Sequence, residues 1–555
     1  MERVSGQVSI IEDGQKSSAS EIKGYSGRPI LIAVPVILAI AVILAVYVLR
    51  LDPAVGVFND DGWYLVLAKS LAAGHGYSLI NLSHSGHHFY PPFYPFLLSL
   101  LYRIWPEFPR NLVLLKSMSI AAVFLLAFIV FKLFDRPDRL PQHLAFLLVV
   151  CTALAPPFVM LATSTLMSEC VFTSLQFAAV LLAERCISSN GRGGSAFATA
   201  LLATAAYLTR TAGVALLLSI GIDFLSRKMF KQLALLIITT VLCASSWSIY
   251  SHVRADLNEE APGYSSQFWQ QRAGMPGQRI EVKSLPRRIW RQATVIIFDD
   301  VGALLAPSLY RTGSESGEEL MNMADSVPWL NHDRSNSVPV STMGLNHGVQ
   351  AISLGFSVVV LLGFLLSVRR GPGSMDLLFL FSLMMIVLWP WDPIRFLVPL
   401  FPILLYYMML AIAGSSRLLR LIFNGQTHVN TWRASRIVTL CILGLFIFDH
   451  ASYLVAKQAG PQSSEYPEWL VNFNAERGAA LWLRDHTAAN EIIAGDNLPL
   501  IYLYSGRMTD ACDFGNCANG EVRYRAQFTS IQSLEGKVVF ESHGKRVLEL
   551  DPTRR

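Results

Sequence analysis

Residues 111–134 read NLVLLKSMSIAAVFLLAFIVFKLF, an apolar run in which Lys116 and Lys132 are the only charged residues. A helix of about 20 such residues spans the roughly 30 Å hydrocarbon core of a bilayer. Because lipid offers the backbone no hydrogen-bond partners, an apolar segment that crosses it must be helical. This stretch therefore predicts a transmembrane helix.

Apolar blocks of similar length recur along the 555 residues. Hydrophobic residues make up 52% of the chain and charged residues only 15%, and the mean hydropathy is +0.41. Soluble proteins carry about 25% charged residues, so this chain lacks the polar surface for a water-soluble fold. The blocks predict an all-α polytopic, multi-pass integral membrane protein with about 11 transmembrane helices, near residues 29–50, 111–134, 143–162, 170–184, 196–209, 212–226, 233–252, 348–368, 375–391, 397–414 and 437–455.

Positive charge is distributed unevenly over the short loops between these spans. One side holds only Arg210 and Arg395, whereas the other holds Arg136, Arg139, Arg185, Arg192, Arg227, Lys228, Lys231, Arg369, Arg370, Arg417, Arg420, Arg433 and Arg436. Cytoplasmic loops are enriched in Lys and Arg. The bias therefore predicts a cytoplasmic N-terminus and an extracytoplasmic C-terminus. It also accounts for most of the net charge of +5, so no nucleic-acid partner is expected.

The predicted topology divides the chain into three parts. Residues 1–28 form a cytoplasmic tail, residues 29–455 a transmembrane domain, and residues 456–555 an extracytoplasmic C-terminal domain. Within the transmembrane domain, residues 51–110 and 253–347 are expected to form outer loops.

The C-terminal domain has the residue patterns of a small α/β unit. Cys512 and Cys517 lie in it, and whether they form a disulfide is left open. The expected elements are a helix over 475–485 and strands over 491–495, 538–541 and 546–550.

The first outer loop contains the acidic sequence NDDGWY at residues 59–64. Asn59 or Asp60 can cap a helix there, because the positive N-terminal end of a helix favours such residues. Apolar residues follow at helical spacing, which predicts a helix lying along the membrane surface. The sequence YPPFYPFLL at residues 90–98 predicts a second interfacial helix.

Five short motifs occur in order between residues 55 and 405. They are DDGWY at 60–64 continuing to GHGY at 74–77, YPPFYP at 90–95, MSE at 167–169, LTRTAG at 208–213 and RFLVPLFP at 395–402. The ordered set resembles the GT-C superfamily of membrane glycosyltransferases, and most of all its branch of protein O-mannosyltransferases and lipid A aminoarabinose transferases. The resemblance implies a GT-C-like fold and a mannosyltransferase-like enzyme of the cell envelope, in a bacterial inner or plasma membrane.

The resemblance also implies a reaction. Such enzymes transfer a hexose or pentose, with inversion, from a polyprenyl-phosphate donor to the hydroxyl of a lipid, glycan or protein acceptor. Displacement at the anomeric carbon needs a carboxylate to take the acceptor's proton. The leaving phosphate needs cations, and Arg can bind two phosphate oxygens at once.

Three carboxylates are candidates for this chemistry. The resemblance selects Asp60 as the catalytic base, whereas the local pattern alone favours a helix cap, and the two roles can coexist. Asp61 is expected to be a dipole partner in the first helical turn or to assist acceptor binding. Glu169, at the outer turn between the third and fourth spans, needs a partner in so apolar a place. In related enzymes an acidic residue there helps to bind the acceptor or a metal, and helix capping is the alternative.

Arg210 and Arg395 are predicted to bind the donor phosphate, because they are the two cations that break the charge bias. One alternative is that each arginine side chain extends to lipid phosphates at the interface. A second alternative, for Arg395 alone, is an ion pair with Asp392.

Tyr64, Tyr90 and His88 are further candidates for the pocket. A divalent metal is an open alternative, with His75 and Glu169 as its candidate ligands. The histidines of the first loop match no tight ligand motif, so no cofactor is assigned.

Two other functions share part of this pattern. An O-antigen ligase or polymerase would use the same type of donor, but its arginine-rich catalytic loop should lie late in the chain. A non-enzymatic transporter should have ionisable residues or broken helices at mid-span. The informative polar residues gather instead at the outer interface, which favours a membrane glycosyltransferase.

Overall fold

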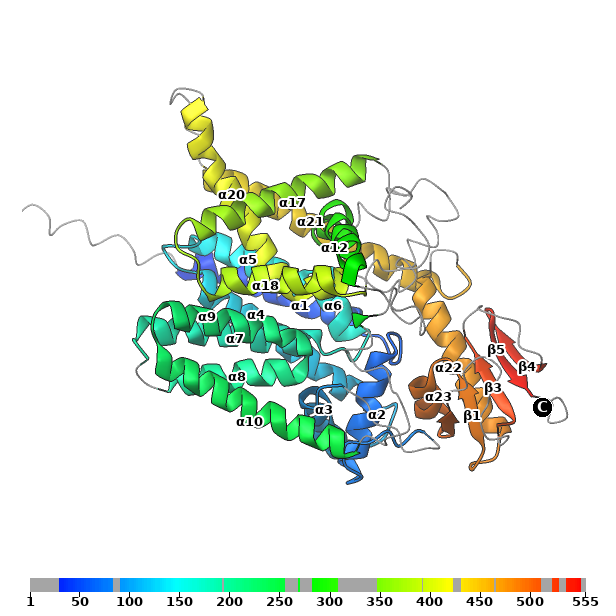
Figure 1. Ribbon diagram of the computed structural model, residues 1–555. Helices are drawn as coiled ribbons and strands as arrows, with labels where there is room; N and C mark the ends of the chain where they lie inside the picture. The colour runs from blue at the N-terminus through cyan, green and yellow to red at the C-terminus, as the bar shows by residue number, and fades with distance from the viewer. Residues whose placement is uncertain are drawn as a thin grey trace, which may run out of the picture.

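The computed structural model describes residues 29–82, 90–191, 194–254, 268–269, 282–307, 347–391, 393–422, 431–463, 466–510, 522–528 and 536–550. Most of these residues form one large helical bundle. A small sheet with two helices lies at one end of the bundle (Figure 1).

The bundle consists of helices that coincide with the predicted apolar blocks. They are α1 (Pro29–Leu49), α4 (Leu112–Phe134), α5 (Gln142–Leu154), α6 (Pro156–Thr163), α7 (Glu169–Ser188), α8 (Ser195–Thr209), α9 (Val214–Ser226), α10 (Phe230–Arg254), α17 (His347–Val368), α18 (Ser374–Leu388), α20 (Phe401–Ile422) and α21 (Thr431–Ala459). Two short elements, α19 (Ile394–Leu397) and η5 (Val398–Leu400), lead into α20, and η1 (Thr211–Gly213) joins α8 to α9.

Within the described residues, six helices are long and apolar enough to cross a membrane: α4, α7, α10, α17, α21 and the segment Ile394–Gly414 that includes α20. Helices α5 and α6, which meet at a 44° bend, would make a seventh span. The other apolar helices, including α8, α9 and α18, are shorter. The chain is thus an integral membrane protein with several spans, but the predicted number of about 11 is not confirmed.

The two helices predicted between the first two spans also form. They are α2 (Asp60–Ala72) and α3 (Phe93–Ile104), which pack against each other beside one end of the bundle (Figure 1). We call this end the α2 end.

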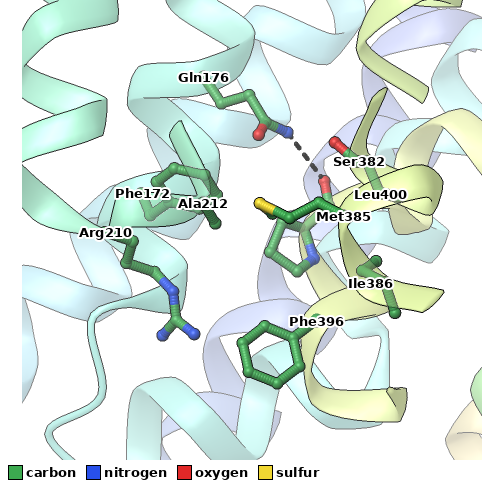
Figure 2. A pocket seen from close by; sticks show the side chains of 10 residues that line it. Phe172, Gln176, Arg210, Ala212, Ser382, Met385, Ile386, Phe396 and Leu400 are labelled. Carbon is green, nitrogen blue, oxygen red and sulfur yellow. Dashed lines mark hydrogen bonds between the residues drawn. The ribbon is translucent and has the colours of Figure 1, made fainter. Parts of the chain in front are cut away.

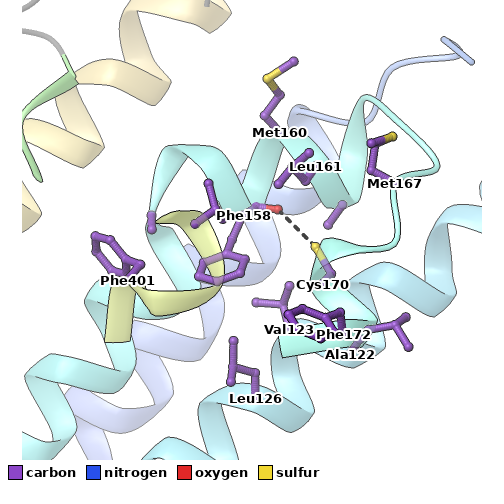
Figure 3. Packing of buried hydrophobic residues seen from close by; sticks show 14 of the residues in the cluster. Ala122, Val123, Leu126, Phe158, Met160, Leu161, Met167, Cys170, Phe172 and Phe401 are labelled. Atoms are coloured by element: carbon purple, nitrogen blue, oxygen red, sulfur yellow. Dashed lines mark hydrogen bonds between the residues drawn. The ribbon is translucent and has the colours of Figure 1, made fainter. Parts of the chain in front are cut away.

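An apolar core fixes the start of α7 at the α2 end. Phe158 of α6 packs edge-to-face on Phe401 of α20, with ring centroids 6.3 Å apart, and both rings are fully buried. Cys170, next in sequence to Glu169, places its Sγ 3.9 Å from the carbonyl oxygen of Phe158 (Figure 3). This packing holds the first turn of α7 against α6 and α20.

A buried polar cluster holds the chain between α1 and α2. The carboxylate of Asp52 accepts hydrogen bonds from Tyr453 at 2.8 Å and Ser164 at 2.7 Å, and it pairs with Lys457 at 2.5 Å. Lys116 of α4 donates to the backbone oxygen of Asp52. Removing a partner from such a cluster would leave a buried charge uncompensated, so the cluster anchors the loop that precedes Asp60.

The C-terminal region forms a five-stranded mixed sheet in the order β2-β1-β3-β5-β4. Strand β1 (Ile492–Gly495) pairs in parallel with β2 (Met508–Asp510) and β3 (Tyr524–Gln527). Strand β5 (Lys545–Glu549) pairs antiparallel with β3 and with β4 (Lys537–Ser542). Two helices complete the unit, α22 (Glu468–His486) and α23 (Leu498–Ser505).

Strands β1, β4 and β5 confirm the three predicted strands, and α22 confirms the predicted helix, which begins earlier than expected. β2, β3 and α23 were not predicted. Cys512 and Cys517 lie outside the described residues.

Gly363 provides a test of the crossing of α17 and α20. A Cβ atom at Gly363 would lie 1.9 Å from the carbonyl oxygen of Tyr407. Gly363→Ala should therefore push the helices apart and destabilise the protein by about 1–3 kcal/mol, measured as a lower unfolding temperature in detergent. Gly355→Ala, on the same helix with no atom within 4 Å, should unfold like the parent. Equal behaviour of the two variants would contradict this crossing.

Candidate functional site

Asp60 lies at the start of α2 and faces cationic and phenolic partners. Its Oδ1 accepts a hydrogen bond from the Tyr90 hydroxyl at 2.5 Å, and its Oδ2 pairs with Arg395 Nη2 at 2.7 Å. The side chain is 28% exposed. The preceding Asn59 has a left-handed backbone (φ 63°) and makes no side-chain capping bond. Asn59 therefore does not cap α2 with its side chain.

Glu169 is the fully buried centre of the site. Its Oε1 pairs with Arg210 Nη1 and with Arg395 Nε, each at 2.6 Å. Its Oε2 is buried without a hydrogen-bond partner among the described residues. Arg210 also donates to Ser168 Oγ at 3.2 Å. One carboxylate oxygen thus brings together two arginines that are far apart in the sequence.

The local backbone structure directs the side chains of both arginines towards Glu169. The backbone at Arg210 is extended (φ −149°, ψ 134°), which ends α8 and turns the chain into η1. Arg395 lies in α19, just after a segment held by Gln292 of α12 (Leu285–Val295). Gln292 donates to the carbonyl oxygens of Trp389 at 2.7 Å and Trp391 at 2.9 Å. The partners of Arg395 are thus Asp60 and Glu169, while Asp392, the alternative partner, lies outside the described residues.

Both guanidinium groups retain N–H groups for a ligand. Arg395 Nη1 and Arg210 Nε and Nη2 make no hydrogen bond within the described part of the chain. The side chains of Arg210 and Arg395 are 10% and 14% exposed. A planar guanidinium with unused donors is well suited to a phosphate or a carboxylate.

Asp61 has a different role from its neighbour. It is fully buried, and its carboxylate accepts hydrogen bonds from the backbone amides of Gly56 at 2.9 Å and Phe58 at 3.1 Å. Burial raises the pKa of Asp61, and these two amides oppose the rise. The side chain thus holds the loop before α2, and Asp61 lies in the first turn of that helix.

An aromatic wall stands beside Asp60. The ring of Tyr64 lies 4.9 Å from that of Tyr90 and 5.2 Å from that of Tyr94, and the Tyr64 hydroxyl accepts a hydrogen bond from Ser168 at 3.4 Å. Tyr64 and Tyr90, both predicted pocket residues, thus lie beside Asp60. Tyr94 and Ser168 were not singled out, although both lie within motifs that carry the family resemblance. His88 lies outside the described residues.

The described residues do not fit the alternative of a metal site. His75 is exposed, and no group of three or more His, Cys, Asp or Glu side chains that could hold an ion occurs among them. The positions next to Glu169 Oε1 are taken by two guanidinium groups. His84 and His87, like His88, lie outside the described residues.

An apolar pocket opens beside Arg210 (Figure 2). The space between its walls, including the open mouth, is about 330 Å³. Arg210 alone is charged among the lining residues, which are Phe172, Gln176, Arg210, Ala212, Ser382, Met385, Ile386, Phe396, Pro399 and Leu400. The guanidinium carbon of Arg210 lies 5.7 Å from the centre of the Phe396 ring, and Gln176 closes the opposite wall by donating to the carbonyl oxygen of Pro399 at 3.3 Å.

By sequence, the chain matches no protein-family profile and no curated protein. In structure it is similar to ArnT from Cupriavidus metallidurans, with 14% identity, a TM-score of 0.49, and coverage of 93% of this chain and 98% of ArnT. It is also similar to the oligosaccharyltransferase AglB from Archaeoglobus fulgidus, with 13% identity, a TM-score of 0.48, and coverage of 88% of this chain and 69% of AglB.

Both neighbours are GT-C glycosyltransferases, the superfamily that the sequence motifs resemble. ArnT is also known with bound undecaprenyl phosphate. At these identities, and with TM-scores below 0.5, the likeness assigns neither an activity nor a substrate to this chain.

The shared ion pair at Glu169 provides a stability test. Glu169→Ala should leave the poorly solvated guanidinium group of Arg210 uncompensated and that of Arg395 with Asp60 alone, and so destabilise the protein by about 3–5 kcal/mol, measured by thermal or denaturant unfolding in detergent. Glu107→Ala is the control, because the Glu107–Arg110 pair is exposed at 62% and 78% and should contribute less than about 1 kcal/mol. A similarly small loss of stability in both variants would contradict the central position of Glu169.

Proposed function

We propose that this protein is an inverting glycosyltransferase that takes its sugar from a polyprenyl-phosphate donor at the outer membrane face. The observation that carries the proposal is the convergence of Asp60, Arg210 and Arg395 around Glu169, at distances of 2.6–2.7 Å. A carboxylate and two guanidinium groups with unused donors are what this transfer requires.

In the proposed reaction, Asp60 takes the proton of the acceptor hydroxyl. The acceptor oxygen forms a bond to the anomeric carbon while the bond from that carbon to the donor phosphate breaks, and its electron pair leaves with the phosphate oxygen. Arg210 and Arg395 stabilise the charge that develops on the phosphate. Glu169 is assigned the task of orienting both arginines rather than of binding a metal.

The Tyr90 hydroxyl supports the assignment of Asp60 as the base. By donating to Oδ1 at 2.5 Å, Tyr90 restricts the rotation of the carboxylate. Tyr64, whose ring is tilted against that of Tyr90 with centroids 4.9 Å apart, extends an aromatic wall against which a sugar ring can pack. The aromatic wall and the partial exposure of Asp60 support entry of the sugar and acceptor from this side.

The pocket at Arg210 supports a lipid-linked donor. A phosphate bound at Arg210 would place its apolar chain beside Phe172, Met385 and Leu400, which line the pocket. Burial of an apolar chain there is favourable by about 25 cal/mol per Å². The first isoprene units are therefore assigned to this pocket. The site is assigned to the outer face because most Lys and Arg residues of the short loops lie on the opposite side, and loops rich in Lys and Arg face the cytoplasm.

Asp60→Asn tests the proposed base. The amide keeps the size of the side chain but cannot accept the proton, so turnover should fall by at least about 100-fold while the unfolding temperature stays close to that of the parent. The measurement is release of polyprenyl phosphate from a panel of polyprenyl-phosphate sugars by the purified protein. Glu107→Gln, at an exposed position, is the control. Full turnover by Asp60→Asn would remove this residue from the mechanism.

The pocket can be tested through the length of the lipid. Ser382→Phe should fill part of the pocket and raise the KM for a long polyprenyl donor by several-fold more than for a donor whose phosphate carries only a methyl group, since that donor has no isoprene units in the pocket. Leu380→Phe, on the same helix and 41% exposed, is the matched control. An equal change in KM for both donors would contradict the placement of the lipid chain.

A further inference from the structure

The C-terminal domain touches the loop that carries the proposed base. Asn497, the N-cap residue of α23, donates from Nδ2 to the carbonyl oxygen of Gly56 at 3.0 Å. Its Oδ1 faces the backbone amide of Leu500 at 3.4 Å, and Nδ2 also donates to Glu476 at 3.2 Å. This one side chain thus joins the helix cap of α23 to the loop before α2.

The contact is close enough to require glycine on the side of α2. Gly56 has a φ of +88°, and a Cβ there would lie 3.1 Å from Leu500 Cβ. A Cβ at Gly62 would lie 2.9 Å from Pro499 Cβ. The backbone of the loop and the first turn of α23 are therefore in direct contact.

A short chain of hydrogen bonds leads from this contact to the base. The Gly56 amide donates to Asp61, as does the Phe58 amide, at 2.9 and 3.1 Å. The backbone amide of Asp60 in turn lies 2.6 Å from the carbonyl oxygen of Phe58. The position of Gly56 thus determines the backbone from which the Asp60 side chain extends.

The domain is also docked at a second place, away from this loop. Thr509 of β2 donates from its backbone amide to the carbonyl oxygen of Asn81 at 2.7 Å, and Asn81 Nδ2 donates to Thr509 Oγ1 at 3.0 Å. The Tyr504 ring packs edge-to-face on Phe108 at 5.0 Å. Loss of the Asn497 contact therefore does not by itself undock the domain.

We propose that the C-terminal domain is part of the catalytic scaffold, and that Asn497 is a positioning residue that sets the orientation of Asp60 through Gly56. The proposal rests on the proposed role of Asp60 as the base. It predicts that the domain affects the chemical step rather than the binding of the donor, since the arginines and the apolar pocket lie on α7, α8, α18 and α19.

The test compares two variants of the full-length protein. Asn497→Ser keeps a side-chain oxygen for the helix cap but removes the amide that binds Gly56. We expect kcat for sugar release to fall about tenfold with the donor KM unchanged. We also expect faster hydrogen exchange of the amides in residues 56–62. Thr509→Val, which removes side-chain hydrogen bonds at the second docking place, should leave both quantities unchanged.

Each outcome decides the inference. Two results for Asn497→Ser would overturn it. One is unchanged hydrogen exchange of the amides in residues 56–62. The other is faster exchange of these amides with an unchanged kcat, provided that the parent turns over donor. Equal effects in both variants would show only general docking and would also overturn it. If the parent turns over no donor, the proposed function fails, while the exchange comparison still decides whether Asn497 positions the loop of Asp60.

Discussion

The whole site depends on one buried carboxylate oxygen. Glu169 Oε1 binds Arg210 and Arg395 at equal distances of 2.6 Å, and Arg395 in turn reaches Asp60. Burying a lone carboxylate or guanidinium is costly by several kcal/mol, and opposite charges in good geometry offset that cost. The ion pairs therefore require α2, α7, α19 and the end of α8 to meet at one place.

This arrangement also explains how four charged groups can lie together at the end of an apolar bundle. The two carboxylates balance the two guanidinium groups, so the site contains no uncompensated pair of cations. Each arginine uses only part of its donor set for Glu169 and Asp60. Arg210 also lines the apolar pocket, and a charged group beside a hydrocarbon surface suits an amphiphilic phosphate ester.

Much of this could be predicted from the sequence, because the relevant forces are local or additive. Apolar blocks predicted the helices of the bundle, and the exceptions to the charge bias singled out Arg210 and Arg395. Long-range pairing could not be predicted: Arg395 is 335 residues from Asp60, and no periodicity indicates which charges will meet. The hydrogen bonds of Asp61 could not be predicted for the same reason, since they depend on how the loop before α2 turns its amides. The number of spans also remained undetermined, because several apolar helices are shorter than a bilayer is thick.

The central claim is that Arg210 and Arg395 recognise the phosphate of a polyprenyl lipid. The most direct measurement is the affinity of the protein in nanodiscs for a polyprenyl phosphate and for the matching polyprenol, in the parent and in the double variant Arg210→Met with Arg395→Met. We expect the parent to bind the phosphate at least tenfold more tightly than the alcohol, and the double variant to lose this preference. Equal binding of the two lipids by the parent, or an unchanged preference in the double variant, would contradict it.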